Sequence, residues 1–223
     1  MLKELKDFKP GDPNLAALRI LLNGQVGAGK SSFINSINTI FQGHIATEAF
    51  ADNTGGQSFT KTYKTYTIEN RSVPGSSYAF VFNDVMGLEA EEQRGTQVDD
   101  IITADQLAII DDKMIEKQKR IREAATDLWI PQVAVLTKVD EACPLVKKDL
   151  RTIYKSRYIK ELIERFSYKL GIPVNCIVPV KNYHNELDLN ENMDVLLLKA
   201  LTHIVNFGND YVRKCPYRNE ETI

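Results

Sequence analysis

Eight residues near the start of the chain, G-Q-V-G-A-G-K-S at 24–31, constrain its fold more than any other feature. They match the pattern G-x-x-x-x-G-K-S of a phosphate-binding loop, which is meaningful only between a strand and a helix. An apolar run at 18–23 precedes the loop, and apolar residues at helical spacing follow it at 32–37. The sequence therefore predicts a strand–loop–helix unit that binds phosphate. The alternative is a glycine-rich turn that binds nothing.

Each residue type in this loop has a physical role. Glycines let backbone N–H groups turn inward around a phosphate, and the helix that begins near Lys30 adds its positive dipole end. We expect Lys30 to reach the β- and γ-phosphates and the Ser31 hydroxyl to bind Mg²⁺. The predicted phosphate-binding residues of this loop are Gly24, Gly27, Ala28, Gly29, Lys30, Ser31 and Ser32.

A second motif, T-K-V-D at 137–140, predicts which base is bound. It follows an apolar strand at 132–136 and matches the [N/T]-K-x-D element of guanine-nucleotide-binding proteins. The Asp140 carboxylate could accept hydrogen bonds from guanine N1–H and the exocyclic amine, whereas adenine offers neither in that geometry. A carboxylate left unpaired by the wrong base costs roughly 1–3 kcal/mol, so guanine is favoured. Thr137 and Lys138 complete the motif, and Lys138 would lay its aliphatic stem over the base.

A third motif, D-V-M-G at 84–87, lies between the other two and follows an apolar strand at 78–83. Asp84 would hold Mg²⁺, through a water molecule. The Gly87 N–H would contact the γ-phosphate, because glycine tolerates the backbone movement that follows when this phosphate leaves. The order of the three motifs along the chain favours a functional role over an ordinary strand-end turn.

Two assignments rest on position alone. A threonine should close over Mg²⁺ just before the strand expected at 62–68, and we choose Thr60 over Thr54 and Thr62. The last strand, expected at 175–180, should present a backbone N–H to guanine O6. Lys181 and Asn182 stand at its end and are the candidates, although both could be ordinary polar loop residues.

The alternation of strands and helices predicts the fold. We expect an α/β, three-layer P-loop GTPase fold with a mainly parallel sheet, one antiparallel strand and helices on both faces. The turn at 72–77 makes the strands at 62–68 and 78–83 antiparallel. Helices are expected at about 30–42, 111–128, 147–170 (interrupted or in two pieces) and 193–211. The chain divides into a leader at 1–16, a guanine-nucleotide-binding domain at 17–215 and a tail at 216–223.

Composition excludes several classes of function. The 223 residues are 43% hydrophobic, which suits one domain with a sizeable core, and the net charge of −2 gives no field that would attract nucleic acid. Cys143, Cys176 and Cys215 lack metal-site spacing, so we expect reduced thiols and a cytoplasmic protein. No run is long and apolar enough to span a membrane.

Four stretches together resemble the GTPase domain of the interferon-induced protein 44 family. They are G-Q-V-G-A-G-K-S-S-F-I-N-S at 24–36, T-K-V-D at 137–140, V-K-N-Y at 180–183 and L-D-L-N-E-N-M-D-V-L-L-L-K-A-L at 187–201. The resemblance implies a cytosolic, interferon-inducible, antiviral or antiproliferative protein of vertebrate innate immunity that binds GTP or GDP with Mg²⁺. Members often carry an N-terminal domain before the GTPase, so we expect a short member or an excised domain.

The chain departs from this family where the fold needs a central strand. No apolar strand is visible from Leu88 to Asp105, and the short run at 106–110 is the sole candidate. The family has a longer loop and a clear apolar strand there. We therefore expect that a segment is missing at Ala104–Asp105, either deleted from the protein or omitted from this chain, and we favour omission.

Catalysis is the second departure, and we predict no catalytic residue. Ras-type GTPases place a glutamine directly after D-x-x-G to orient the attacking water, and here that position is Leu88. Intrinsic turnover should then be about 10⁻³ s⁻¹ or slower. Gln93, or a second copy forming a homodimer across the nucleotide face, could supply the missing group. The chain is thus either a slow GTP-hydrolysing switch or a non-hydrolysing nucleotide-binding interaction module; an ATPase would require Asp140 to be irrelevant.

Overall fold

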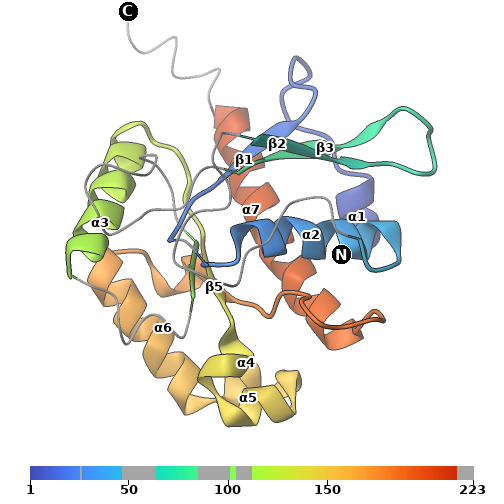
Figure 1. The fold of residues 1–223 in the computed structure, drawn as a ribbon. Helices are drawn as coiled ribbons and strands as arrows, with labels where there is room; N and C mark the ends of the chain where they lie inside the picture. Colours follow the sequence, from blue (N-terminus) through green and yellow to red (C-terminus); the bar gives the residue numbers. More distant parts are fainter. Residues whose placement is uncertain (26, 47–63, 85–100, 104–111, 215–223) are drawn as a thin grey trace, which may run out of the picture.

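Short apolar strands alternate with helices to build an α/β fold, shown in Figure 1. The computed structural model describes residues 1–25, 27–46, 64–84, 101–103 and 112–214. The strands are β1 (Leu18–Leu22), β2 (Lys64–Glu69), β3 (Ser77–Asp84), β4 (Ile101–Thr103), β5 (Ala134–Thr137) and β6 (Ile177–Pro179). The helices are α1 (Leu2–Lys6), α2 (Lys30–Gln42), α3 (Asp112–Asp127), α4 (Val139–Ala142), α5 (Pro144–Lys148), α6 (Arg157–Leu170) and α7 (Glu191–Lys214), with 3₁₀ turns at Leu150–Lys155 and Val174–Cys176.

Local sequence signals account for most of these boundaries. The helix predicted at 30–42 is α2, and the interrupted helix predicted at 147–170 is resolved into α5, a 3₁₀ turn and α6. The Ser156 hydroxyl accepts a hydrogen bond from Ile159 N and so caps the start of α6, which ends at Gly171. The short helices α1 and α4 carry no such signal in the sequence, and neither was predicted.

The strands form two three-stranded ladders. One has the order β1-β3-β2, in which β1 and β3 are parallel and β2 is antiparallel to β3, as the turn at 72–77 predicted. The other has the order β4-β5-β6 and is parallel throughout. The predicted class is confirmed, because the sheet is mainly parallel with one antiparallel strand. Among the described strands, however, no ladder joins β1 to β4.

The central strand lies where the sequence showed none. We expected no strand before Asp105 and named 106–110 as the sole candidate, but β4 spans Ile101–Thr103 and pairs with β5 from Ile101↔Val135 to Thr103↔Thr137. The expectation failed because three residues are too few to show a periodic apolar pattern. Ala104, Asp105 and the run at 106–110 lie outside the described residues.

Alternation along β5 and β6 places helices on both faces of the second ladder. Ala134, Leu136 and Ile177 point into one hydrophobic cluster, with α4 and α6, and Val135 and Val178 point into the other, with α2 and α7. The first ladder is different: Leu18, Ile20 and Leu22 pack on the α2–α7 side, while the intervening β1 residues are exposed. Helix α7 contributes to both clusters and so connects the two halves of the fold. Its Leu201 lies in the cluster with α2, and its Leu196 lies in the cluster with α4 and α6.

A cavity of about 500 Å³ lies beside β1. It lies between all five residues of β1, the segment at 130–133 that leads into β5, and the C-terminal half of α7. This is the same place where the two ladders fail to join.

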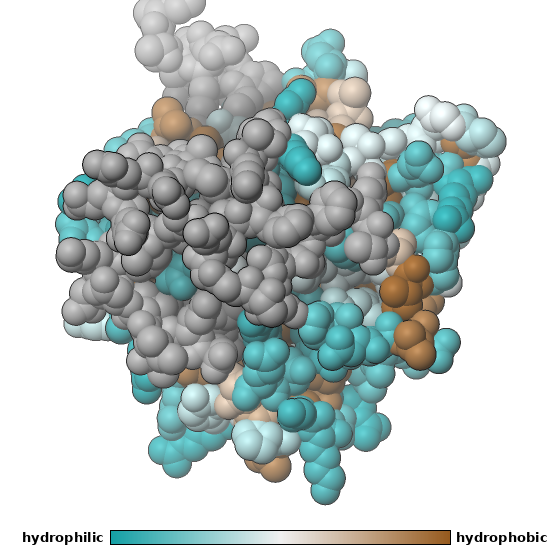
Figure 2. Space-filling view, viewed as in Figure 1, coloured by the Kyte–Doolittle hydropathy of each residue, from teal (hydrophilic) through white to brown (hydrophobic). Residues whose placement is uncertain are grey.

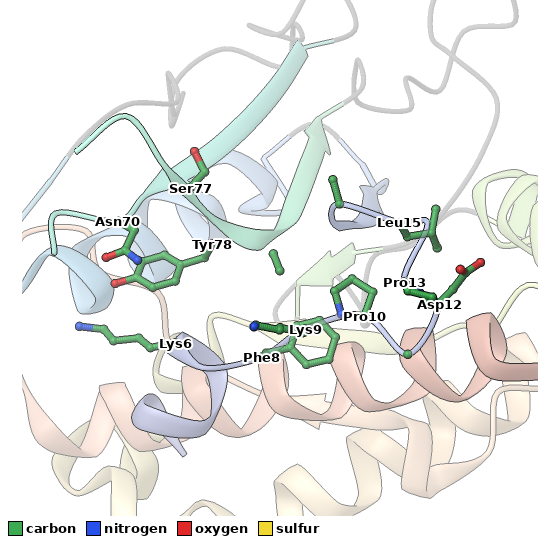
Figure 3. A pocket seen from close by; sticks show the side chains of 13 residues that line it. Lys6, Phe8, Lys9, Pro10, Asp12, Pro13, Leu15, Asn70, Ser77 and Tyr78 are labelled. Carbon is green, nitrogen blue, oxygen red and sulfur yellow. The ribbon is translucent and has the colours of Figure 1, made fainter. Parts of the chain in front are cut away.

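The first residues of the chain pack onto the fold. Leu5 of α1 belongs to the main hydrophobic cluster, and Gly11 N donates a hydrogen bond to Asn209 Oδ1 of α7 at 2.7 Å. A cavity of about 530 Å³ lies between this segment and the start of β3, with Lys6, Lys9 and Tyr78 around it (Figure 3). The division into leader, domain and tail stays a prediction, and 215–223 lies outside the described residues.

The surface of the described residues agrees with the balanced composition. In Figure 2, hydrophilic side chains predominate among the coloured residues, with small, separate hydrophobic areas. None of the described helices combines the length and the apolar character that crossing a membrane requires.

Candidate nucleotide site

The phosphate-binding loop connects the end of β1 to the start of α2, as predicted. Gly27 has φ +75° and Gly29 has φ +86°, in the left-handed region that favours glycine. Gly29 is also the N-cap of α2, so the free N–H groups of the first helical turn face the loop. Gly27 and Gly29 therefore adopt backbone conformations that glycine allows and other residues rarely take. Val26 lies outside the described residues.

Lys30 is buried at the base of this loop. Its ammonium donates hydrogen bonds to the backbone oxygens of Gly24 at 3.0 Å and Gln25 at 3.1 Å. Burial lowers the pKa of Lys30 to about 8, although the nearby negative charge of Asp84 acts in the opposite direction. A phosphate entering the loop would offer this ammonium a charged partner in place of two neutral carbonyls.

Ser31 and Asp84 come together from different motifs. The Ser31 hydroxyl donates a hydrogen bond to Asp84 Oδ2 at 2.8 Å. The register of the parallel ladder explains this meeting, because Leu22 pairs with Asp84 and so both strands end at the same level. A hydroxyl oxygen beside a carboxylate is a donor set that suits Mg²⁺. Ser32 follows in the first turn of α2, where its backbone oxygen accepts a hydrogen bond from Ser36 Oγ at 2.7 Å.

The T-K-V-D motif and the end of the last strand are both hydrogen-bonded to the predicted phosphate loop. Thr137 Oγ1 donates to Ala28 O at 2.8 Å, and Asn182 Nδ2 donates to Gly29 O at 3.1 Å. A Cβ atom added to Gly29 would lie 2.9 Å from Asn182 Nδ2, so this glycine is also needed for close approach. We had predicted base contacts for Thr137 and Asn182; their role in holding the loop was not predicted.

Charged side chains gather at the other end of the site. Asp140 lies in the first turn of α4, just after β5. Lys138, at the N-cap of α4, adopts φ +54°, a conformation that non-glycine residues rarely take. Lys181 Nζ lies 3.7 Å from Asp140 Oδ2 and 2.7 Å from Glu186 Oε1. The predicted residues Asp140 and Lys181 are thus neighbours, and Glu186, which was not predicted, lies beside them.

Glu186 is held firmly in its turn. Its Oε2 accepts hydrogen bonds from His184 N at 2.9 Å and Asn185 N at 3.2 Å, while Oε1 accepts from Lys181. Burial alone would raise the pKa of Glu186, but the hydrogen bonds from Lys181 and His184 N lower it to about 2. No motif marks this residue, since a glutamate in a polar loop is common.

Several predicted residues cannot be placed in this site. Thr60 and Gly87 lie outside the described residues. The same holds for the alternatives Thr54 and Thr62, and for Leu88 and Gln93, on which the expectations about hydrolysis rested.

The fold and the arrangement of this site define the class of protein: an α/β protein with a P-loop GTPase fold. A solved structure titled as a probable GTP-binding protein engB has a TM-score of 0.49 and 12% sequence identity, over 84% of this chain and 99% of its own. That likeness is too distant to carry an argument about function. No family model matches the chain.

Curated relatives are more informative. Interferon-induced protein 44-like of Homo sapiens is 28% identical over 265 residues, which cover 100% of this chain and 58% of the relative. Interferon-induced protein 44 of Pan troglodytes is 28% identical over 97% of this chain and 58% of its own length, and that of Mus musculus is 27% identical over 97% and 60%. These relatives confirm the resemblance to the interferon-induced protein 44 family and support the assignment of this chain to it.

The lengths of these matches differ from the length of the chain. The chain spans about 58% of the length of the Homo sapiens relative. The match extends over 265 residues, whereas the chain has 223, so the relative has residues within the matched region that have no counterpart here. That the missing residues fall at Ala104–Asp105 stays a prediction.

Proposed function

We propose that this chain binds a guanine nucleotide, GTP or GDP, in the site between β1, α2, β5 and β6. The observation that carries the proposal is the pair of hydrogen bonds from Thr137 and Asn182 to the phosphate loop. They bring the phosphate motif and the base motif, more than a hundred residues apart in sequence, into one continuous site. A nucleotide likewise has phosphates at one end and a base at the other.

Mg²⁺ would bind with the nucleotide. Ser31 and Asp84 offer the hard oxygen atoms that this ion prefers, and phosphate oxygens would complete its coordination. Bound Mg²⁺ would neutralise charge on the β- and γ-phosphates, while Lys30 would supply a second positive charge from within the loop. Thr60 remains our proposed third metal-binding residue, and Gly87 our proposed contact for the γ-phosphate.

We propose slow GTP hydrolysis or none, because Leu88 stands where Ras-type GTPases have a glutamine. The likeness to interferon-induced proteins supports a role in the interferon response, and we place that role in the cytoplasm. A homodimer across the nucleotide face is one way for a second copy to supply a missing catalytic group. A non-hydrolysing interaction module is the alternative function, and it is favoured by the same leucine.

Nucleotide binding is tested by titrating the purified chain with GTP, GDP and ATP, with and without Mg²⁺, and by identifying any nucleotide that co-purifies. We expect binding of GTP and GDP, tightened by Mg²⁺, and at least 100-fold weaker binding of ATP. Equal affinity for ATP and GTP would overturn the guanine assignment. No nucleotide binding at all would overturn the function.

Hydrolysis is tested by measuring GTP turnover per molecule across a wide dilution series, alongside Leu88→Gln. We expect a slow rate that rises with protein concentration if a second copy supplies the catalytic group. A fast rate independent of concentration would reveal a catalytic group within one chain. No turnover at any concentration would favour the interaction module.

A further inference from the structure

The base end of the proposed site contains a lysine that the guanine motif does not require. Lys181 Nζ lies between two carboxylates, 2.7 Å from Glu186 Oε1 and 3.7 Å from Asp140 Oδ2. The three side chains are 25%, 24% and 18% exposed, respectively, so this cluster is partly shielded from water but still open at the surface. The ammonium therefore lies near the Asp140 carboxylate, which is the group proposed to bind the base.

The turn that carries Lys181 is anchored at several points. Glu186 accepts two backbone hydrogen bonds from its own turn. Tyr183 N donates to Ser36 Oγ of α2 at 2.8 Å, and the Tyr183 hydroxyl donates to Asp194 Oδ1 of α7 at 2.6 Å. Asn190 N donates to the same hydroxyl at 2.6 Å. These contacts attach the turn to α2 and α7, and within the turn Glu186 holds the ammonium by the 2.7 Å contact.

We propose that the Lys181 ammonium, held in place by Glu186, donates a hydrogen bond to O6 of the bound guanine. The inference rests on the proposed function and deepens it. Asp140 would accept from guanine N1–H and the 2-amino group, and the next group along that edge of the base is O6, an acceptor. The cation beside Asp140 is the matching donor. Adenine carries an amino group at this position, which an ammonium cannot recognise.

Glu186 is a positioning residue in this scheme. Two carboxylates compete for one ammonium, and the shorter contact is to Glu186, at 2.7 Å against 3.7 Å to Asp140. Without the Glu186 charge, Lys181 would pair with Asp140 and compete with the base for its carboxylate oxygens. The Glu186 carboxylate therefore keeps Asp140 available for guanine and keeps the ammonium beside it.

The test compares three nucleotides that differ in one group of the base. GTP has both O6 and the 2-amino group, ITP lacks the 2-amino group, and 6-thio-GTP replaces O6 with a weakly accepting sulfur. Affinities at about pH 7 are measured for the wild type, Lys181→Met and Glu186→Gln. Glu161→Gln, which removes the charge from an exposed ion pair with Arg157 on α6, is the matched control.

We expect the wild type to prefer GTP over 6-thio-GTP by about tenfold or more, which corresponds to a charge-assisted hydrogen bond. Lys181→Met should abolish this preference while keeping the preference for GTP over ITP, which depends on Asp140. Glu186→Gln should reduce the preference for GTP over 6-thio-GTP in the same direction by a smaller factor, and Glu161→Gln should change neither preference.

The outcomes separate the inference from the function on which it rests. If the wild type binds GTP tightly and Lys181→Met keeps the full preference over 6-thio-GTP, the inference is wrong and a backbone N–H reads O6. If Glu186→Gln lowers affinity for all three nucleotides equally, Glu186 supports the fold and is no positioning residue. If the wild type does not prefer GTP over ATP, the proposed function itself fails.

Discussion

The two halves of the sheet differ in how they assemble their part of the site. The half formed by β1, β3 and β2 carries the phosphate loop, in which one stretch from Gly24 to Ser32 supplies almost every group. The half formed by β4, β5 and β6 carries the proposed base end, where Asp140 of α4 meets Lys181 and Glu186 from the turn after β6. The proposed phosphate site is thus local in sequence, whereas the proposed base site is assembled from two segments that meet only in the folded chain.

The halves also differ in how they are covered. Both faces of β5 and β6 are packed against helices, whereas one face of β1 is exposed among the described residues. The two ladders are joined by α7 and by the hydrogen bonds of Thr137 and Asn182 to the loop. A nucleotide bound across both halves should therefore stabilise the whole fold.

The largest expected effect comes from the base-reading half. Asp140→Asn should lower GTP affinity by about 100-fold, because two hydrogen bonds to the base are lost and the amide repels the base amine. The same variant should gain affinity for XTP, since the amide can donate to the xanthine C2 carbonyl. Isothermal titration with both nucleotides checks this. Unchanged GTP affinity with no gain for XTP would show that T-K-V-D does not read the base.

The next effect comes from the phosphate half. Lys30→Ala should lower the affinities for GTP, GDP and ITP alike by about tenfold or more, because it removes a charge-assisted contact worth roughly 1.5–3 kcal/mol. Ser31→Asn should have a similar effect, but only when Mg²⁺ is present. Binding unchanged in both variants would contradict the phosphate-loop assignment. A base-dependent loss in Lys30→Ala would contradict the division of labour between the halves.

The contrast between the halves explains what the sequence could predict. The helix at 30–42, the glycine conformations and the meeting of Ser31 with Asp84 follow from one motif and one parallel register, so they could be anticipated. Glu186 could not, because its proposed role depends on a contact with Lys181 across a turn and on the approach of Asp140 from α4. The central strand β4 was missed because its three residues carry too little pattern.

Lys30 should also make nucleotide binding depend on pH. Its pKa is about 8 in the folded chain without ligand and about 10.4 in an unfolded chain, so the folded state binds fewer protons between these values. The stability of the ligand-free fold should therefore rise with pH through this window. A bound phosphate restores the charged form, so binding takes up a proton and affinity should fall by somewhat less than tenfold from about pH 7.5 to pH 9.

The control for this pH effect is Lys30→Arg, whose guanidinium stays protonated throughout the window. Ionisation of guanine N1–H affects both proteins equally, so the difference between their slopes isolates Lys30. Titrations at several pH values, with proton uptake obtained from buffers of different ionisation enthalpy, check the prediction. Equal slopes for wild type and Lys30→Arg would mean that the lysine is already fully charged before the nucleotide binds.

The smallest effect concerns the junction between the halves. Thr137→Val keeps the side-chain shape but loses the hydrogen bond to Ala28 O, which should cost about 0.5–1.5 kcal/mol. Affinities for GTP, ITP and 6-thio-GTP should therefore fall by the same factor, about two- to tenfold, since the loop is loosened and base reading is untouched. Thermal unfolding of the ligand-free chain should move to a slightly lower temperature.

Thr126→Val is the matched control, because Thr126 Oγ1 makes a hydrogen bond of the same 2.8 Å length to Arg122 O on the exposed surface of α3. If both variants bind all three nucleotides like the wild type, the phosphate loop keeps its shape without the base half. If Thr137→Val changes the ratio of GTP to ITP, Thr137 takes part in base reading and the two halves are less separate than proposed.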